Sequence, residues 1–312
     1  MQAVVTDPAT AARLRLTDAA RPEPAPGQAL VKVHAFSLNA GETRTALAAT
    51  EQYTPGWDFA GVVEEPASDG SGPAKGARVF GVAQQGAWAE YVAADPRFMS
   101  DIPDTVGYAE AAAVPVAAVT ALAGLESAGT LLGRRVLVTG AAGGVGRYAC
   151  QLAHLAGAEV FAVSRRSSLP EHLRADGVPV ARIFPTITDA KQAGTYDVIL
   201  DGIGGDSLAT ALTALAPGGT CITFGNGSGQ PVSFFPADFY YTPGVRLQGL
   251  WLGNFILAGT NCRPMLTRLI ELVAQGRLVP PIHQVQPWTK IADAAQQLTR
   301  QGVDGKIVLQ VE

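Results

Sequence analysis

The central part of the chain alternates between short apolar runs and segments in which apolar residues recur at helical spacing. Short runs of this kind predict buried strands, whereas the helical recurrence predicts amphipathic helices. The predicted strands cover residues 136–139, 159–163, 181–184, 196–200 and 220–224. The predicted helices between them cover residues 145–156, 170–176 and 207–215. Such alternation is typical of an α/β fold with a doubly wound parallel sheet.

The two ends of the chain have a different pattern. Short apolar runs at residues 29–35, 58–64, 77–81 and 87–92 are separated by segments rich in Pro and Gly, which predicts a compact, partly open barrel. An Ala-rich helical stretch over residues 109–128, interrupted at Pro115, follows. Near the C-terminus the pattern predicts a helix over residues 266–274 and a strand over 305–311. Since a terminal strand often pairs back with the first domain, we expect that domain to be discontinuous.

Composition and charge narrow the classes of function. With 312 residues, 47% of them hydrophobic and 16% charged, the chain can bury a sizeable core. A net charge of −4 provides no basic surface for nucleic acid. No apolar run is long enough to span a membrane, and the first residues lack the pattern of a signal peptide. Three widely spaced cysteines predict free thiols and a cytoplasmic protein, with Cys150 and Cys221 structural and Cys262 in a polar loop that could be exposed.

A glycine-rich turn joins the predicted strand 136–139 to the predicted helix 145–156. It contains Gly140, Gly143, Gly144, Val145 and Gly146. Glycines there allow a tight turn and a close approach of the backbone to a pyrophosphate, and the N–H groups at the start of the helix attract the phosphates. Strand, glycine turn, helix and strand together predict a site for a dinucleotide.

The residues after the second of these strands predict which dinucleotide is bound. Sites that prefer NADH usually place Asp or Glu there to bind the ribose 2′-hydroxyl. This chain has Ser164, Arg165 and Arg166 instead. A guanidinium group can bind a phosphate with two parallel hydrogen bonds, so we predict NADPH. The alternative is that both arginines belong to a solvated loop.

Several blocks of sequence resemble a known family in order and spacing. They are GRRVLVTGAAGGVGRYACQLA, YDVILDGIGG, LAPGGTCITFGNGSG, LVKVHAFSLNAGE, YTPGWDFAGVV and the closing GKIVLQV. Nearly end to end, the chain resembles the zinc-independent branch of the medium-chain dehydrogenase/reductase superfamily, which includes quinone oxidoreductases, zeta-crystallin-like proteins and 2-enoyl thioester reductases. The resemblance implies a GroES-like β-rich domain from residues 1–114 and 257–312, a Rossmann domain over residues 115–256, an active site between them, and a homodimer.

The same resemblance separates this chain from the zinc alcohol dehydrogenases. Those proteins carry a Cys where Ser37-Leu38-Asn39 lies here, and Gly-His-Glu where this chain has Gly56-Trp57-Asp58. The four closely spaced Cys of a structural zinc lobe are also missing. We therefore expect no metal, and we interpret His34 as a half-buried residue of a strand.

The resemblance also implies further site residues. Asn39 matches a position that faces nicotinamide and substrate, where its amide would donate to the substrate carbonyl; the alternative is that it caps the following turn. Thr120, Phe224 and Gly225 match positions near the cofactor. Leu250 and Trp251 match a segment at the edge of the nicotinamide and at the dimer interface, and packing alone is an equal alternative for Trp251.

The chain departs from the family where many relatives carry a tyrosine as proton donor. Arg44 and Thr50 lie near the expected positions, and Tyr53 is the first tyrosine available. Three alternatives follow: Tyr53 replaces the missing donor, Arg44 binds an acidic or thioester substrate, or water supplies the proton. Tyr240 and Tyr241 are interpreted as packing residues.

The resemblance implies an NADPH-dependent oxidoreductase that transfers a hydride to a quinone or to an activated C=C bond of an enone or enoyl substrate. Its partner would be a small apolar substrate, with no nucleic acid and no membrane. The alternatives are a specialised enoyl reductase or cyclase of secondary metabolism and a protein that binds NADPH without turnover.

Overall fold

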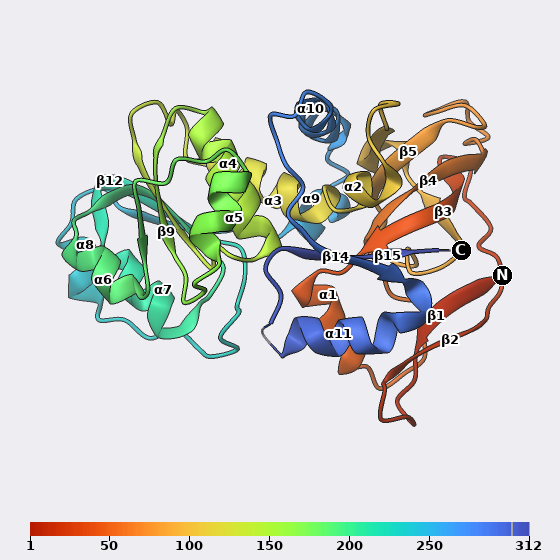
Figure 1. Ribbon diagram of the computed structural model, residues 1–312, viewed down its shortest axis with the longest axis horizontal. Coiled ribbons are helices and arrows are strands. Elements are labelled where there is room, and N and C mark those ends of the chain that lie inside the picture. The colour runs from red at the N-terminus through yellow and green to blue at the C-terminus, as the bar shows by residue number, and fades with distance from the viewer. Residues whose placement is uncertain (301, 312) are drawn as a thin grey trace. The chain divides into compact units, whose positions relative to one another are not determined.

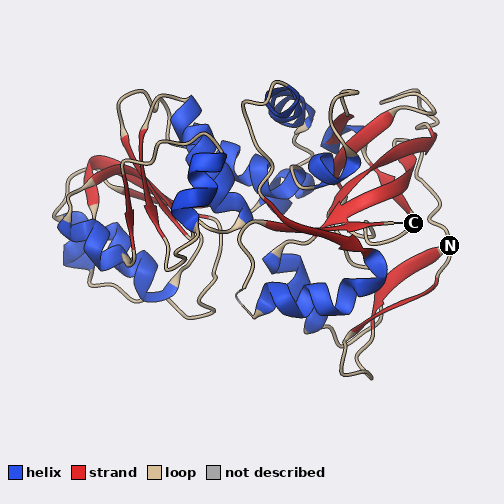
Figure 2. Ribbon diagram, in the orientation of Figure 1, coloured by secondary structure: helices blue, strands red, loops and turns tan. Residues whose placement is uncertain are grey.

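The computed structural model describes residues 1–300 and 302–311, and the chain divides into two compact units (Figure 1). Unit 1 consists of Met1–Val119 with Leu252–Glu312, and unit 2 consists of Thr120–Trp251. The expected boundaries followed residues 114 and 256, whereas the structure divides after residues 119 and 251. Strands predominate in unit 1, whereas strands and helices alternate in unit 2 (Figure 2).

Within its described residues, unit 2 contains a six-stranded sheet in the order β10-β9-β8-β11-β12-β13, and every neighbouring pair is parallel. The strands are β8 (Arg135–Thr139), β9 (Glu159–Val163), β10 (Arg182–Phe184), β11 (Tyr196–Asp201), β12 (Leu215–Thr223) and β13 (Arg246–Gly249). The interior strands β8, β9 and β11 are almost continuously buried, because helices cover both faces of a parallel sheet. This confirms the predicted α/β class and the doubly wound sheet.

The helices of unit 2 lie on both faces of this sheet. On one side are α4 (Gly144–Leu155) and α5 (Leu169–Ala175), and on the other are α6 (Ile187–Gln192) and α7 (Gly205–Leu212) (Figure 1). The short helix α8 (Pro236–Tyr240) precedes β13. The helix predicted over residues 207–215 was wrong at its end, since the chain turns after Leu212 and Leu215 already pairs with Tyr196 in the sheet.

In the described part of unit 1, a seven-stranded sheet runs in the order β14-β15-β3-β4-β5-β7, with β6 paired to β3. These strands are β3 (Ala29–Ser37), β4 (Asp58–Glu65), β5 (Arg78–Val82), β6 (Tyr91–Ala94), β7 (Met99–Asp101), β14 (Ile282–Pro287) and β15 (Lys306–Gln310). The strands β1 (Gln2–Thr6) and β2 (Leu14–Asp18) pair with each other. The predicted return of the terminal strand is confirmed, because β15 pairs antiparallel with β3.

Helices and a mixed aromatic and aliphatic core complete unit 1. The helices are α1 (Ala40–Leu47), α2 (Tyr108–Ala112), α3 (Pro115–Ser127, which continues into unit 2), α9 (Leu252–Leu257), α10 (Arg263–Ala274) and α11 (Ile291–Thr299). Phe36 contributes to the core beside Trp88 and Trp288, with ring centroids 6.0 and 6.5 Å away. His34 is half-buried and stacks on Tyr108.

One local prediction in unit 1 was wrong, and the structure decides one point that the sequence left open. The strand expected over residues 87–92 begins only at Tyr91, because Ala87 and Trp88 instead bond to the backbone of Gly56 and Pro55. Cys262, whose exposure the sequence left open, is buried and precedes α10 as its N-cap.

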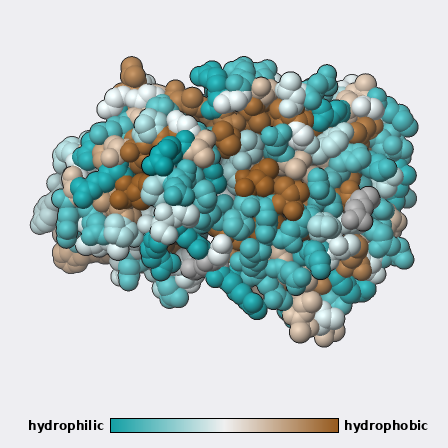
Figure 3. Space-filling view, in the orientation of Figure 1, coloured by the Kyte–Doolittle hydropathy of each residue, from teal (hydrophilic) through white to brown (hydrophobic). Residues whose placement is uncertain are grey.

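The exterior is mostly polar on the face shown in Figure 3, where hydrophilic residues surround scattered hydrophobic groups. Among the described residues, we find no helix with the length and apolar character needed to cross a membrane.

Candidate functional site

The glycine turn predicted from the sequence lies at the carboxyl end of β8. Gly140 has a φ of 63°, a conformation that L side chains rarely adopt. Gly146 is packed so closely that a Cβ there would lie 2.4 Å from the carbonyl oxygen of Gly140. Gly143 caps α4, and Gly144 and Val145 form its first turn. The turn therefore has the close packing and the partly exposed helix N-terminus that fit a pyrophosphate.

Ser164, Arg165 and Arg166 directly follow β9, the neighbour of β8. The N–H of Ser164 donates to the carbonyl of Phe184 at 3.0 Å, and the N–H of Arg166 donates to Ser164 Oγ at 3.0 Å. Arg165 is exposed and Arg166 is half-buried. Because the carboxyl ends of parallel neighbours meet at one edge of the sheet, the segment lies at the same edge as the glycine turn.

A buried hydrogen bond between Thr139 and Asp201 joins β8 to β11. The strand order reverses between these two strands. The hydroxyl of Thr139 donates to Asp201 Oδ1 at 2.7 Å, and Asp201 Oδ2 accepts from the N–H of Gly204 at 2.9 Å. Burial raises the pKa of Asp201, although these hydrogen bonds oppose the rise. Sequence reasoning missed both residues; their signal was a polar residue at the end of each apolar run.

Four further residues expected at the cofactor follow the carboxyl ends of β12 and β13, at the same edge of the sheet as the glycine turn: Phe224, Gly225, Leu250 and Trp251. The N–H of Phe224 donates to the carbonyl of Asp201 at 3.0 Å, and a Cβ on Gly225 would lie 3.0 Å from the carbonyl oxygen of Gly202. The N–H of Leu250 donates to the carbonyl of Thr223 at 2.8 Å. Thr120 is buried in α3, whereas the side chain of Trp251 is 53% exposed. The structure thus gathers most of the expected cofactor residues along one sheet edge.

In unit 1, Asn39 lies at the start of α1 within a buried polar cluster. Its Nδ2 donates to Glu42 Oε1 at 2.9 Å and to Asp58 Oδ2 at 2.8 Å, and its Oδ1 accepts from Lys306 Nζ. Both amide hydrogens are therefore used inside the protein. To donate to a substrate carbonyl, as the sequence predicted, Asn39 would have to give up one of these bonds.

Asp58 is the most heavily bonded member of this cluster. Its Oδ2 also accepts from Ser37 Oγ at 2.6 Å and from Lys306 Nζ at 3.1 Å, and its Oδ1 accepts from the N–H of Val116 at 2.8 Å. Lys306 is almost fully buried against it. Sequence reasoning missed Glu42 and Lys306 as members of the site.

The tyrosines and Arg44 occupy different surroundings. Tyr53 is half-buried, and burial, followed by the negative charge of Glu42, raises the pKa of its hydroxyl. Arg44 lies on α1 and is exposed. Tyr240 and Tyr241 are exposed, with their rings 5.0 Å apart, so neither is a packing residue within this chain. Tyr53 remains the candidate proton donor.

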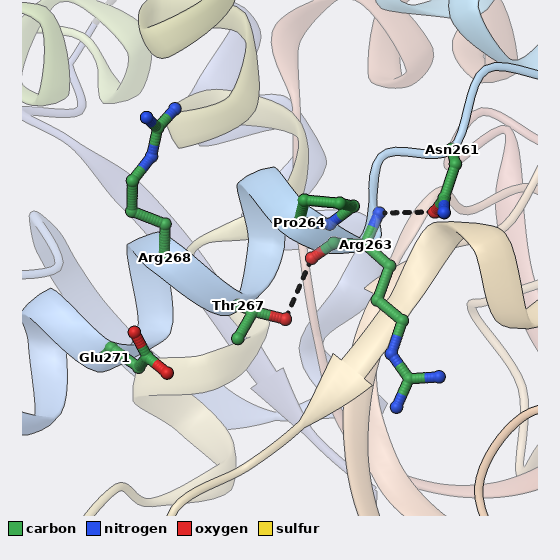
Figure 4. A pocket seen from close by; sticks show the side chains of 6 residues that line it. All are labelled: Asn261, Arg263, Pro264, Thr267, Arg268 and Glu271. Atoms are coloured by element: carbon green, nitrogen blue, oxygen red, sulfur yellow. Dashed lines mark hydrogen bonds between the residues drawn. The ribbon is translucent and has the colours of Figure 1, made fainter.

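A separate pocket opens beside the N-terminal turns of α10 (Figure 4). Its lining consists of Asn261, Arg263, Pro264, Thr267, Arg268 and Glu271. Asn261 Oδ1 accepts from the N–H of Arg263 at 3.1 Å, and Arg263 also reaches Asp101 at 3.2 Å. The lining contains none of the residues that the sequence pointed to, so we assign the pocket no part in the chemistry.

Comparison with protein families gives three matching models. Residues 25–104 match the alcohol dehydrogenase GroES-like domain, and residues 173–309 match the zinc-binding dehydrogenase model. Residues 136–197 match the NAD dependent epimerase/dehydratase family.

Individual proteins and solved structures are similar to the chain over nearly its whole length. The chain is 30% identical to the quinone oxidoreductase of Sus scrofa, over 94% of this chain and 92% of that protein. It is 36% identical to the spectinabilin polyketide synthase system protein NorB of Streptomyces orinoci, over 91% of this chain but only 13% of the length of NorB. The solved quinone oxidoreductase of Coxiella burnetii superimposes with a TM-score of 0.85 at 26% identity, covering 100% of this chain and 99% of that one.

The zinc named by one of these models does not fit the residues of this chain. Within residues 1–300 and 302–311, no group of three or more His, Cys, Asp and Glu side chains is arranged to hold a metal ion. Asn39 and Asp58 occupy the segments that carry ligands in zinc dehydrogenases, and both are already bonded to Lys306. The ammonium group of Lys306 supplies the positive charge beside Asp58.

Proposed function

Because the chain belongs to the medium-chain dehydrogenase/reductase superfamily and is an oxidoreductase with quinone oxidoreductase relatives, we propose that it uses NADPH to reduce a quinone or an activated C=C bond. The observation that carries the proposal is the pairing of the glycine turn after β8 with Ser164, Arg165 and Arg166 after β9. The turn fits a pyrophosphate, and the two arginines occupy the position at which a carboxylate would repel a 2′-phosphate.

Gly140, Gly143, Gly144, Val145 and Gly146 would hold the pyrophosphate, and Ser164, Arg165 and Arg166 would hold the 2′-phosphate. Thr120, Phe224, Gly225, Leu250 and Trp251 would line the rest of the cofactor. NADPH supplies the hydride that adds to the electron-poor carbon or to the quinone. Tyr53 is the side chain that we assign to donate the proton. Asn39 would contact the substrate oxygen through its amide, giving up its present bond to Asp58 Oδ2.

The substrate would be small and mostly apolar, and the family relatives suggest two classes. The quinone oxidoreductase relative favours a quinone, whereas the similarity to NorB favours an enoyl reductase or cyclase of polyketide metabolism. We place the protein in the cytoplasm, where its buried free cysteines would remain reduced.

The experiment that tests this function is oxidation of NADPH with a panel of acceptors, followed by absorbance and repeated with NADH. The panel contains 1,4-benzoquinone, 9,10-phenanthrenequinone, a simple enone and crotonyl-CoA. Turnover with quinones alone would assign a quinone reductase, and turnover of the enone or thioester would assign an ene-reductase. Tight binding of NADPH without turnover of any acceptor would contradict the proposal and favour a non-catalytic NADPH-binding protein.

We also propose that the activity is independent of zinc. Prolonged treatment with a strong chelator, followed by desalting, is expected to leave the turnover rate unchanged. The reason is that Lys306 already supplies the positive charge beside Asp58. Metal analysis of the treated protein is the control. Loss of activity on chelation that added zinc restores would overturn this part of the proposal.

A second copy of this chain is the partner we propose for unit 2. The edge strand β13 is exposed along its length, and exposed edges are ready to pair with another strand. Large apolar side chains are also exposed nearby in the sequence: Phe235, Tyr240, Tyr241, Leu247 and Trp251. We expect light scattering after gel filtration to give the mass of a dimer. Leu247→Lys should shift it toward a monomer, and a monomeric parent protein would contradict the proposal.

A further inference from the structure

Among the residues that the structure describes, the cluster beside α1 contains two carboxyl groups and one cation. Asp58 and Glu42 are both buried, and the ammonium of Lys306 lies 3.1 Å from Asp58 Oδ2. If both acids were ionised, the cluster would carry one uncompensated negative charge away from water, which is costly. A single added proton makes the cluster neutral.

The hydrogen bonds indicate which acid carries that proton. Asp58 accepts from Ser37, Asn39, Lys306 and the N–H of Val116 across its two oxygens. Glu42 Oε1 accepts from the backbone N–H and the amide of Asn39, each at 2.9 Å. Glu42 Oε2, by contrast, is buried and has no hydrogen-bond partner. Asp58 therefore has the surroundings of a carboxylate, and Glu42 those of a carboxylic acid.

We propose that Glu42 is a positioning residue, held as a neutral carboxylic acid, that fixes Asn39 and keeps a second negative charge away from Tyr53. The role rests on the proposed reductase activity, because its purpose is to orient the polar contacts of the substrate and the proton donor. A proton on Oε2 leaves both bonds from Asn39 to Oε1 in place. Loss of the proton adds a negative charge that repels Asp58 and makes Tyr53 a weaker acid.

The electrostatics agree with this assignment. Burial raises the pKa of Glu42 to about 8, the negative charge of Asp58 adds to the rise, and Lys306 and the bonds from Asn39 oppose it. Once Glu42 is ionised, its negative charge helps to raise the pKa of Tyr53. The other elements near Glu42 add little charge, since Arg44 on α1 and Asp293 on the neighbouring α11 are both exposed.

Stability tests the protonation state without any need for activity. A carboxyl whose pKa is raised on folding binds a proton in the native chain that the unfolded chain has already released. The contribution of Glu42 to the melting temperature should therefore fall as the pH rises from about 4.5 to about 8 and then level off. Glu42→Gln keeps the neutral shape, so its advantage over wild type should grow across this range. The control Glu51→Gln changes an exposed acid of the same unit and should follow wild type.

Kinetics then test the positioning role. Wild-type kcat is expected to fall about tenfold per pH unit above a pH of about 8, whereas Glu42→Gln should lack this limb. Glu42→Asp keeps a titrating acid and should retain it. The dissociation constant of NADPH should change less than about twofold in each variant, because no bond to unit 2 is altered.

The outcomes separate this role from the proposed function. If no acceptor is reduced, the reductase proposal fails, yet the melting series still decides whether Glu42 is neutral. If Glu42→Gln shows the same melting dependence on pH as wild type, the neutral acid is overturned. If the melting series supports a neutral Glu42 but kcat of Glu42→Gln still falls above a pH of about 8, the positioning role is overturned. Should Glu42→Gln fail to fold, infrared difference spectra of wild type and Glu42→Asp between about pH 6 and pH 9 replace it. The absence at about pH 6 of a protonated carboxyl band that Glu42→Asp shifts overturns the proposal.

Discussion

Replacing Asp176 by leucine is expected to lower the free energy of unfolding by about 3–5 kcal/mol. Asp176 caps the end of α5 and holds Arg147 of α4 with both carboxylate oxygens, Oδ2 accepting from Nε at 2.9 Å and Oδ1 from Nη2. The side chains are only 8% and 1% exposed. Burial raises the pKa of the neighbouring Cys150 to about 12, and the charge of Asp176 adds to the rise. Without Asp176, the guanidinium would remain buried with its main partner lost.

Denaturant and thermal unfolding followed by circular dichroism measure this loss, and two further variants interpret it. Arg147→Met combined with Asp176→Leu removes both charges and should recover most of the stability. Glu65→Ala breaks the Arg21–Glu65 pair, whose side chains are 42% and 55% exposed, and should cost less than about 1 kcal/mol. If Asp176→Leu and Glu65→Ala lowered the free energy of unfolding equally, burial would not make the Arg147–Asp176 pair more stabilising than an exposed pair.

The Arg147–Asp176 pair also joins the two helices that flank the proposed cofactor site. The helix α5 starts soon after Ser164, Arg165 and Arg166, and Asp176 fastens its far end to α4, which begins at the glycine turn. The two segments that we propose to bind phosphate are therefore parts of one packed layer on the sheet. The local sequence around Arg147 does not predict the ion pair, because Asp176 lies 29 residues later in the chain.

The parallel sheet could be predicted from the sequence because its central strands are buried on both faces. The segments β8, β9 and β11 are short apolar runs with clear ends, so their positions follow from hydrophobicity alone. The edge strand β13 escaped prediction because all of its residues are exposed, and Arg246 and Gln248 interrupt any apolar pattern. Its pairing with β12 depends on backbone hydrogen bonds that no side-chain pattern records.

The glycine turn was predictable because backbone geometry restricts the residue type. At Gly146 an added Cβ would overlap the backbone of Gly140. Only glycine fits there, so the glycine in the sequence indicates the tight turn. The cluster around Asn39 was only half predictable. Lys306 lies 267 positions from Asn39, and the two meet because β15 returns to β3. The sequence predicted that return, but not which side chain it would bring to Asn39.

The double variant Arg165→Ala/Arg166→Ala is expected to weaken NADPH binding on the order of 100-fold or more, while NADH binding changes less than about threefold. Hydrogen bonds from a charged donor contribute about 1.5–3 kcal/mol each, and the forked guanidinium can make two to one phosphate. The 2′-phosphate is the group that distinguishes the two cofactors, so only NADPH should lose these bonds. Calorimetric titration of each cofactor gives both dissociation constants directly.

Three further variants separate phosphate binding from general charge. Arg174→Ala removes an exposed arginine of α5 and should leave the preference unchanged, because that residue lies at the far end of the helix. Arg165→Lys/Arg166→Lys keeps the charges but loses the forks and should give an intermediate preference. Ser164→Asp introduces the carboxylate found in sites that prefer NADH and should favour NADH by repelling the phosphate. If the double alanine variant kept the parent ratio of the two dissociation constants, the arginines would be ordinary surface residues and the basis for NADPH would be lost.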